Sequence, residues 1–238
     1  MIDRKIIHQP IYSPAFLYLR ETAVALQSAI EAVASSEKVV IDLGCWDKPY
    51  RSLFNERYRT YVGIDLAMHE RGVIDVQADA ARLPLKSESA DVVLCTESLE
   101  HCKHTQAVVD EIHRSLKHGG VALLTVVLLF QKHNHADYYR WTDAGVNELF
   151  KQFRQVECRP IGDSITCLVS LFNSFIISLL PKKLNQRHTE LLRDNIAALI
   201  PKLFLDLFFT FVNVLGYTLS RTTRNHELTS SYLVAARK

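Results

Sequence analysis

The sequence of 238 residues lacks several features that assign a protein to a class at once. Its 28 lysines and arginines nearly balance its 26 acidic residues, and the net charge of +2 gives no strong electrostatic footprint for nucleic acid. Its five cysteines are odd in number and lack Cys-x-x-Cys spacing, which indicates reduced thiols in a cytoplasmic protein. No long apolar run follows Met1, so no signal peptide is expected.

Glycine is also scarce, and this narrows the choice of nucleoside ligand. A dinucleotide-binding loop uses G-x-G-x-x-G so that the backbone can approach a pyrophosphate. In this chain the apolar run 39–43 is followed by Gly44 alone. A ligand with an adenosine end and no phosphates does not require the other glycines.

The residues on both sides of Gly44 predict a β-α-β unit. Residues 39–43 and 61–65 are short β-branched runs of the kind that form buried parallel strands. The second run ends at Asp65, 21 residues after Gly44. An acid at this position accepts ribose hydroxyls in open α/β sheets, so the unit predicts a nucleoside site.

This stretch resembles the class I S-adenosylmethionine-dependent methyltransferases. Their first motif reads roughly Asp-x-Gly-x-Gly, and one branch of the family carries Leu-Gly-Cys-Gly followed shortly by Pro-Tyr. Leu43-Gly44-Cys45-Trp46 and the later Pro49-Tyr50 are similar to that branch except at Trp46. The resemblance implies an α/β Rossmann-like methyltransferase fold, with a doubly wound, mostly parallel seven-stranded sheet. It also implies S-adenosylmethionine as cofactor, whose chemistry needs no metal.

Trp46 departs from the family pattern. If the second loop glycine uses positive φ, a tryptophan there costs about 1–2 kcal/mol and places an indole beside the ligand. Two interpretations stay open: the indole points away and caps the pocket, or the cofactor site is weakened.

Later strand ends supply the other expected cofactor contacts. Asp79 and Ala80 follow the strand expected over 73–78, where the resemblance implies an acid on the adenine amino group beside a backbone contact. Asp79 taken alone also suits a turn. The expected cofactor-binding residues are Asp42, Gly44, Trp46, Asp65, Leu66, Asp79, Ala80, Thr96 and Glu97.

Helical spacing of apolar residues predicts a helix over 13–34 that begins at Ser13-Pro14 and packs on the sheet. The resemblance implies that such a helix helps to close the ligand pocket, which makes Tyr18 and Arg20 candidates beside the plainer role of a covering helix. Asp47 and Pro49 suit the start of another helix, and Gly119-Gly120 suits a helix C-cap. The remaining expected helices cover 50–57, 105–117 and 143–151, and the remaining strands cover 90–95, 121–129, 153–160 and 231–237.

The loop over 131–142 is the segment densest in reactive side chains. His135 and Asp137 are the expected catalytic residues, with the histidine as general base beside a carboxylate. A metal site that includes His133 is not expected, because the spacing matches no established ligand signature. The resemblance favours a lid over a base, since some family members carry a similar Asp followed by Tyr, Arg and Thr.

Residues 163–226 predict a helical insertion before the last strand, while 1–162 and 227–238 form the expected S-adenosylmethionine-binding domain. Helices over 165–180 and 203–219 each combine a narrow polar stripe with a wide apolar face. The second spans about 25 Å, short of the roughly 30 Å of a bilayer core, so a spanning helix is not expected. A helical pair packed on itself, on the sheet or on a second subunit, and a cap that admits an apolar acceptor or rests on a membrane, both stay open.

Together these observations predict an enzyme that transfers a methyl group from S-adenosylmethionine to an O or N atom of a small acceptor, with an apolar or lipid-linked acceptor as a narrower option. The expected partners are that acceptor, a second copy of the chain and a membrane surface, but not nucleic acid. The expected location is cytoplasmic or membrane-peripheral. The alternative is a non-catalytic adapter that kept the fold and lost the cofactor through Trp46.

Overall fold

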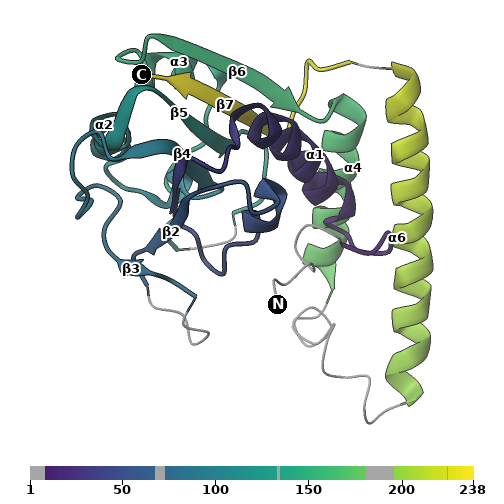
Figure 1. The fold of residues 1–238 in the computed structure, drawn as a ribbon. Helices are drawn as coiled ribbons and strands as arrows, with labels where there is room; N and C mark the ends of the chain where they lie inside the picture. The colour runs from purple at the N-terminus through teal and green to yellow at the C-terminus, as the bar shows by residue number, and fades with distance from the viewer. Residues whose placement is uncertain (1–8, 68–72, 133–134, 181–195, 224) are drawn as a thin grey trace.

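The computed structural model describes residues 9–67, 73–132, 135–180, 196–223 and 225–238 (Figure 1). Within these residues seven strands form one sheet in the order β3-β2-β1-β4-β5-β7-β6. Strands β1 to β5 pair in parallel, and β7 pairs antiparallel with both β5 and β6. The strands are β1 (Val39–Leu43), β2 (Thr60–Asp65), β3 (Val76–Gln77), β4 (Ala90–Thr96), β5 (Leu116–Val127), β6 (Gln155–Ile161) and β7 (Ser231–Arg237). This confirms the doubly wound, Rossmann-like methyltransferase fold.

Helices cover both faces of the sheet. They are α1 (Phe16–Val33), η1 (Arg51–Phe54), η2 (Leu99–His101), α2 (Thr105–Ser115), α3 (Asp143–Leu149), α4 (Ser164–Leu179) and α6 (Ile196–Thr223). Neighbouring residues of a strand point to opposite faces, so Val40 packs with Leu26 and Ile30 of α1, while Ile41 joins the core under α2 and α3. The sheet is therefore buried on both faces, as a parallel sheet requires.

The helix expected over 50–57 is wrong. The chain forms only the short 3₁₀ helix η1 there, because Asn55 and Glu56 both adopt left-handed φ, at 49° and 54°, and end it.

Two other helix ends also differ from expectation. Helix α1 begins at Phe16, whose N–H donates to the main-chain oxygen of Ser13 at 3.0 Å.

Helix α2 stops earlier than the glycines suggest. It ends at Ser115, and Leu116 is already extended, so Gly119 and Gly120 lie inside the long strand β5. The expected C-cap is therefore wrong. Gly119 has φ of 75° and lies where the register between β4 and β5 shifts, since Ala90 pairs with Leu116 but Val92 pairs with Val121.

Helices α4 and α6 lie between β6 and β7 in the chain and stand side by side at one edge of the molecule (Figure 1). Asp163 and Thr166 form a capping box that starts α4, with the side chain of each accepting from the backbone N–H of the other. Helix α6 has 28 residues and is about 42 Å long. It includes Pro201, so the expected start at Leu203 is wrong. The prediction that this helix is too short to span a bilayer is therefore also wrong. By length and composition alone, Leu203–Thr222 is long and apolar enough to cross one.

Candidate functional site

The loop after β1 has an unusual backbone. Gly44, Trp46 and Lys48 have φ of 64°, 45° and 57°, so every second residue of the loop is left-handed. For the two residues with side chains this costs about 1–2 kcal/mol each. Gly44 has no alternative, because a Cβ there would lie 2.0 Å from Oγ of Ser98. The loop is thus pressed against the end of β4.

Two carboxylates hold this loop. Oδ2 of Asp65 accepts from the backbone N–H of Trp46 at 3.0 Å, and Oδ1 accepts from Ala67 at 3.2 Å. The buried ammonium of Lys48 lies 2.5 Å from Oδ2 of Asp75. Partial burial raises the pKa of Asp75, but the hydrogen bonds from Lys48 and a backbone N–H outweigh it and hold that pKa below its usual value. The strained loop is therefore anchored from β2 and the chain before β3.

A cleft of about 620 Å³ opens where β1, β2 and β4 end. This volume is typical of small-molecule sites. Seven of the nine expected cofactor-binding residues line it: Gly44, Trp46, Asp65, Leu66, Asp79, Ala80 and Glu97. Trp46 is 60% exposed, so its indole stands on the wall of the cleft while remaining open to solvent. The carboxyl ends of parallel strands thus bring together acids that lie far apart in the sequence.

The other two expected residues lie behind the cleft wall. Asp42 is buried in β1 and accepts from the hydroxyl of Tyr61 at 2.6 Å. Burial raises the pKa of Asp42 to about 7. Thr96 is buried at the end of β4, opposite Thr125 of β5. The structure gives Asp42 and Thr96 supporting positions beneath the site, not a place on its surface.

The turn after β4 forms much of the remaining wall, and sequence reasoning placed only Glu97 there. Ser98, His101, Cys102, Lys103 and His104 all line the cleft. The Glu100-His101 pair at the start of a helix was the available signal in the sequence. A first-turn glutamate at a helix N-terminus explains such a pair equally well, which is why the signal was weak.

Glu97 connects the cleft to helix α1. It follows β4 with a left-handed φ of 46°, and its backbone N–H donates to Oγ1 of Thr125 at 3.0 Å. Its carboxylate accepts a short hydrogen bond from the hydroxyl of Tyr18, which also lies 3.0 Å from Oγ of Ser231. Burial raises the pKa of Tyr18 well above its usual value, so the phenol keeps the proton that it donates. The sequence made Tyr18 a candidate for the pocket, and its hydroxyl contacts Glu97 on the cleft wall.

Glu100 is fully buried beneath this wall. Neither of its carboxylate oxygens has a hydrogen-bond partner among the described residues. Burial, and then the nearby negative charge of Glu97, raises the pKa of Glu100 to about 8. At neutral pH the folded protein therefore holds this side chain largely as the neutral acid.

Residues 135–141, which we name the cleft loop, pack against the same turn. The N–H of Tyr138 donates to the main-chain oxygen of Glu100 at 2.9 Å, and Nδ1 of His101 lies 2.5 Å from the main-chain oxygen of Ala136. The hydroxyl of Tyr139 donates to the main-chain oxygen of Lys103 at 3.0 Å. Ala136 and Tyr138 line the cleft, so the loop forms one side of it.

The two expected catalytic residues are not on the cleft wall. His135 is exposed at the start of the cleft loop. The carboxylate of Asp137 is buried and pairs with both terminal nitrogens of Arg140, at 2.8 Å for Nη2. The geometry therefore assigns Asp137 to holding the loop, and the catalytic role of both residues stays a prediction. His133 lies outside the described residues.

Residues 41–124 match the protein family described as a methyltransferase domain. This range runs from β1 into β5 and contains both acids of the cleft, Asp65 and Asp79. A protein of Methanocaldococcus jannaschii is 32% identical over 92 residues, which cover 37% of this chain and 40% of that protein. The match thus spans less than half of the relative.

Solved structures that share the fold include methyltransferases and a [4+2]-cyclase. An S-adenosylmethionine-dependent methyltransferase of Archaeoglobus fulgidus is 11% identical, with 91% of this chain and 94% of that chain covered and a TM-score of 0.53. A phosphoethanolamine N-methyltransferase of Haemonchus contortus, solved with S-adenosyl-L-methionine, is 16% identical with a TM-score of 0.56. It matches 99% of this chain and 59% of its own length. At these identities the likeness establishes the fold.

Proposed function

We propose that this protein is an S-adenosylmethionine-dependent methyltransferase that acts on an O or N atom of a small acceptor. The observation that carries the proposal is the cleft where β1, β2 and β4 end, with Gly44 at its base and Asp65 and Asp79 on its wall. Two acids at successive strand ends suit the ribose hydroxyls and the adenine amino group, because both ligand groups donate hydrogen bonds. The absence of a side chain at Gly44 lets the loop lie directly against Ser98, and both residues line the cleft.

The chemistry asked of the protein is mainly positioning. Bound S-adenosylmethionine supplies an electrophilic methyl group on a sulfonium. The acceptor's lone pair forms the new bond to carbon as the carbon–sulfur bond breaks, and the acceptor's proton passes to a base or to water. Asp65 and Asp79 fix the adenosine end, while Tyr18 and Glu97 shape the side of the cleft nearest α1.

A second cavity of about 410 Å³ is the proposed acceptor site. It lies between α4 and the segment after β5, and its wall is mainly apolar, with Leu128, Phe130 and Phe175 beside the guanidinium of Arg140. The ring of Tyr18 stands 5.0 Å from the ring of Phe130, while its hydroxyl reaches Glu97 in the cofactor cleft. Tyr18 thus touches the walls of both cavities, which favours an acceptor with an apolar part.

Isothermal titration of the full chain tests the proposal. S-adenosylmethionine and S-adenosylhomocysteine are expected to compete for one binding site, because the two ligands share the adenosine end. NAD serves as the control ligand, since the single glycine of the loop does not suit a pyrophosphate. A folded chain that binds neither sulfur nucleoside would contradict the proposal and favour the adapter, in which Trp46 has closed the site.

A further inference from the structure

Helix α4 buries its polar stripe and exposes its apolar face. The residues that it buries against the protein include Thr166, Ser170 and Asn173, whereas its large apolar side chains face outward. The outward stripe consists of Leu168, Phe172, Phe175 and Leu179, at the spacing of one helix face. A helix on the surface of a water-soluble domain places its polar side chains outside, so this arrangement needs a partner for the apolar face.

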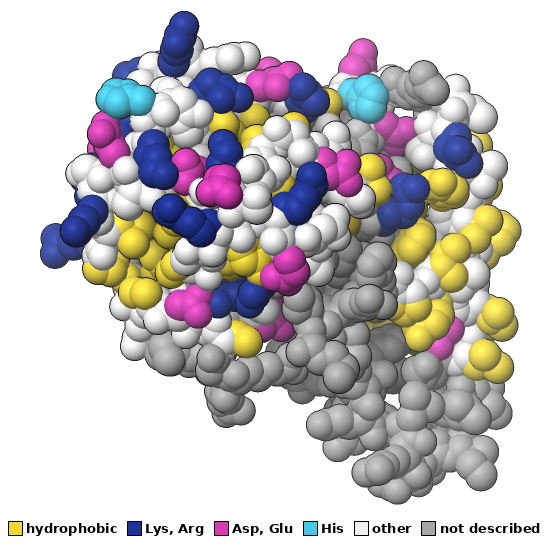
Figure 2. Space-filling model, in the orientation of Figure 1, with side chains coloured by type: hydrophobic (Ala, Val, Ile, Leu, Met, Phe, Trp, Pro, Cys, Tyr) yellow, Lys and Arg dark blue, Asp and Glu magenta, His cyan; other side chains and the backbone are white. Residues whose placement is uncertain are grey.

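Helix α6 repeats the pattern over a greater length. Asn213 is fully buried, while Phe204 and Phe211 are 69% and 67% exposed. Other exposed apolar residues on the helix are Leu203, Leu207, Leu215 and Leu219. The rings of Phe172 and Phe208 contact each other at 6.3 Å between centroids and join the stripes of the two helices. Figure 2 shows the hydrophobic side chains gathered along the outer side of α6.

We propose that this shared face of α4 and α6 is a membrane-contact surface that lies in the plane of one lipid leaflet. The face consists of leucine and phenylalanine, the side chains that enter the acyl region beneath the headgroups in interfacial helices. Among the described residues, its exposed large apolar side chains are leucine, phenylalanine and valine, whereas tryptophan and tyrosine are enriched and leucine is under-represented at the hot spots of protein interfaces. A lipid surface therefore fits its chemistry better than a second copy of the chain.

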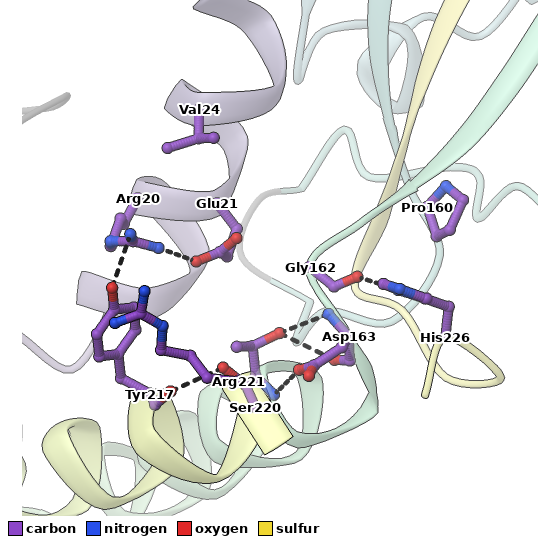
Figure 3. A pocket seen from close by; sticks show the side chains of 11 residues that line it. Arg20, Glu21, Val24, Pro160, Gly162, Asp163, Tyr217, Ser220, Arg221 and His226 are labelled. Carbon is purple, nitrogen blue, oxygen red and sulfur yellow. Dashed lines mark hydrogen bonds and ion pairs between the residues drawn. The ribbon is translucent and has the colours of Figure 1, made fainter. Parts of the chain in front are cut away.

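Positive charge beside one end of this face supports a lipid with an anionic headgroup. A cavity between α1, the start of α4 and the end of α6 holds two guanidinium groups on the ring of Tyr217 (Figure 3). Arg20 lies 4.6 Å and Arg221 5.4 Å from the centroid of that ring. Arg20 also pairs with Glu21, which leaves Arg221, exposed in the last turn of α6, as the more available cation. Cations at this position attract acidic headgroups.

The packing of α6 requires an in-plane helix and opposes a spanning one. The amide of Asn213 donates to the main-chain oxygens of Ile11 and Ser13 at 2.7 and 2.8 Å. One turn later, a Cβ added to Gly216 would lie 2.7 Å from Val169 and 3.2 Å from Leu17, so α6 touches both α4 and α1 there. A helix held at Asn213 and Gly216 by the globular domain cannot also be surrounded there by acyl chains.

Vesicle co-sedimentation of the full chain tests the surface. The wild type is expected to sediment with phosphatidylcholine vesicles that contain phosphatidylglycerol, and less with phosphatidylcholine alone. The double variant Phe204→Ser with Phe211→Ser should lower the partition coefficient at least tenfold without a loss of thermal stability, because both rings are exposed. The control is Leu66→Ser, an apolar residue that is 68% exposed on the wall of the cofactor cleft and belongs to neither α4 nor α6, which should leave partitioning unchanged. Arg221→Glu should reduce only the preference for the acidic lipid.

A depth measurement separates the two membrane orientations. Tryptophans placed at Phe204 and Leu215 stand about 16 Å apart along the helix axis. In an in-plane helix both tryptophans lie at the same depth in the leaflet. Lipid brominated at one position of the acyl chain then quenches the fluorescence of both to the same extent. Unequal quenching would assign α6 to a spanning orientation and overturn the proposal.

Two further results would also overturn it. One is a wild type that fails to sediment with either vesicle. The other is a dimer in lipid-free solution that dissociates in the Phe204→Ser, Phe211→Ser variant, because a second copy would then be what covers the face. None of these readouts depends on the cofactor, so the surface and the proposed activity stand or fall separately.

Discussion

The side-chain amide of Asn173 donates to the side-chain oxygen of Asn213 at 3.0 Å, and both residues are fully buried. Asn173 lies on α4 and Asn213 on α6, and each also donates to a main-chain oxygen in the segment that precedes α1. One polar cluster therefore joins three segments that are far apart in the sequence. It fixes which faces of α4 and α6 point inward.

Replacing Asn213 with alanine should destabilise the protein. The change removes the acceptor of the buried Asn173 amide, at a cost of about 1–3 kcal/mol, together with two hydrogen bonds to the less buried oxygens of Ile11 and Ser13. Urea denaturation followed by circular dichroism measures the loss. Thr218→Ala is the matched control on the same helix, since that hydroxyl is exposed and bonds only within α6. Equal effects of the two changes would contradict the role given to the cluster.

Asp65→Ala should weaken S-adenosylmethionine binding at least tenfold, or about 1.4 kcal/mol, through loss of a charge-assisted ribose contact. The same carboxylate holds the backbone of Trp46, so part of the loss arises from a looser loop. Asp79→Ala should have a smaller effect if backbone groups hold the adenine. Titration calorimetry measures both, with exposed Asp110→Ala on α2 as control. Unchanged affinity in Asp65→Ala would refute the nucleoside assignment.

Trp46→Gly should tighten cofactor binding several-fold with little change in stability. Relief of the left-handed strain gains about 1–2 kcal/mol, which the flexibility of glycine in the unfolded chain offsets by about 0.5–1 kcal/mol. The exposed indole loses few contacts. Trp46→Phe, which keeps a bulky ring in the same backbone, is the control. Weaker binding in the glycine variant would mean that the indole is part of the ligand site.

Glu100→Gln should remove a pH dependence of folding. The folded pKa of about 8 lies above the ordinary value of 4.5, so the folded state binds a proton that the unfolded state has released. The free energy of unfolding therefore falls as pH rises from about 4.5 to about 8, by at most about 1.4 kcal/mol per pH unit, and is flat above that range. Denaturation at a series of pH values should show a shallower slope for the glutamine variant. An unchanged slope would contradict the raised pKa, and exposed Glu157→Gln serves as control.

His135→Ala should lower the rate of methyl transfer and leave cofactor affinity nearly intact, if the cleft loop covers the acceptor. His135 is exposed and is not part of the cofactor cleft wall, which is the reason to expect the split. Paired measurements of kcat and of S-adenosylmethionine Kd check it. Equal losses in both would place the residue in the cofactor pocket.

Most of the sheet was predictable, because buried strands leave a clear apolar pattern in sequence. The two acids at strand ends were predictable for the same reason, since parallel strands end at one edge. Asp42 and Thr96 show the limit of that reasoning. Position near a strand end does not tell whether a side chain points into the cleft or into the sheet beneath it.

The helices outside the sheet were less predictable. Pro201 is typical of a helix boundary, yet it lies in the second turn of α6, where it supplies no N–H to the helix and the helix nevertheless continues. The polar stripes of α4 and α6 were visible in sequence, but their direction was not. Hydrophobic patterning assumes water outside, and here Asn213 is inside while Phe211 is outside.

Strand β7 has a consequence for the order of events during synthesis. It pairs with β5 on one side and β6 on the other, so β6 has no neighbour in the sheet until residues 231–237 have left the ribosome. Helices α4 and α6 emerge before it, when the domain that receives them is still open. Because domains fold as their residues become available, the apolar helices meet their surroundings before the sheet is closed. A truncated nascent chain that ends after α6 should therefore expose both helices and depend most on chaperones or lipid.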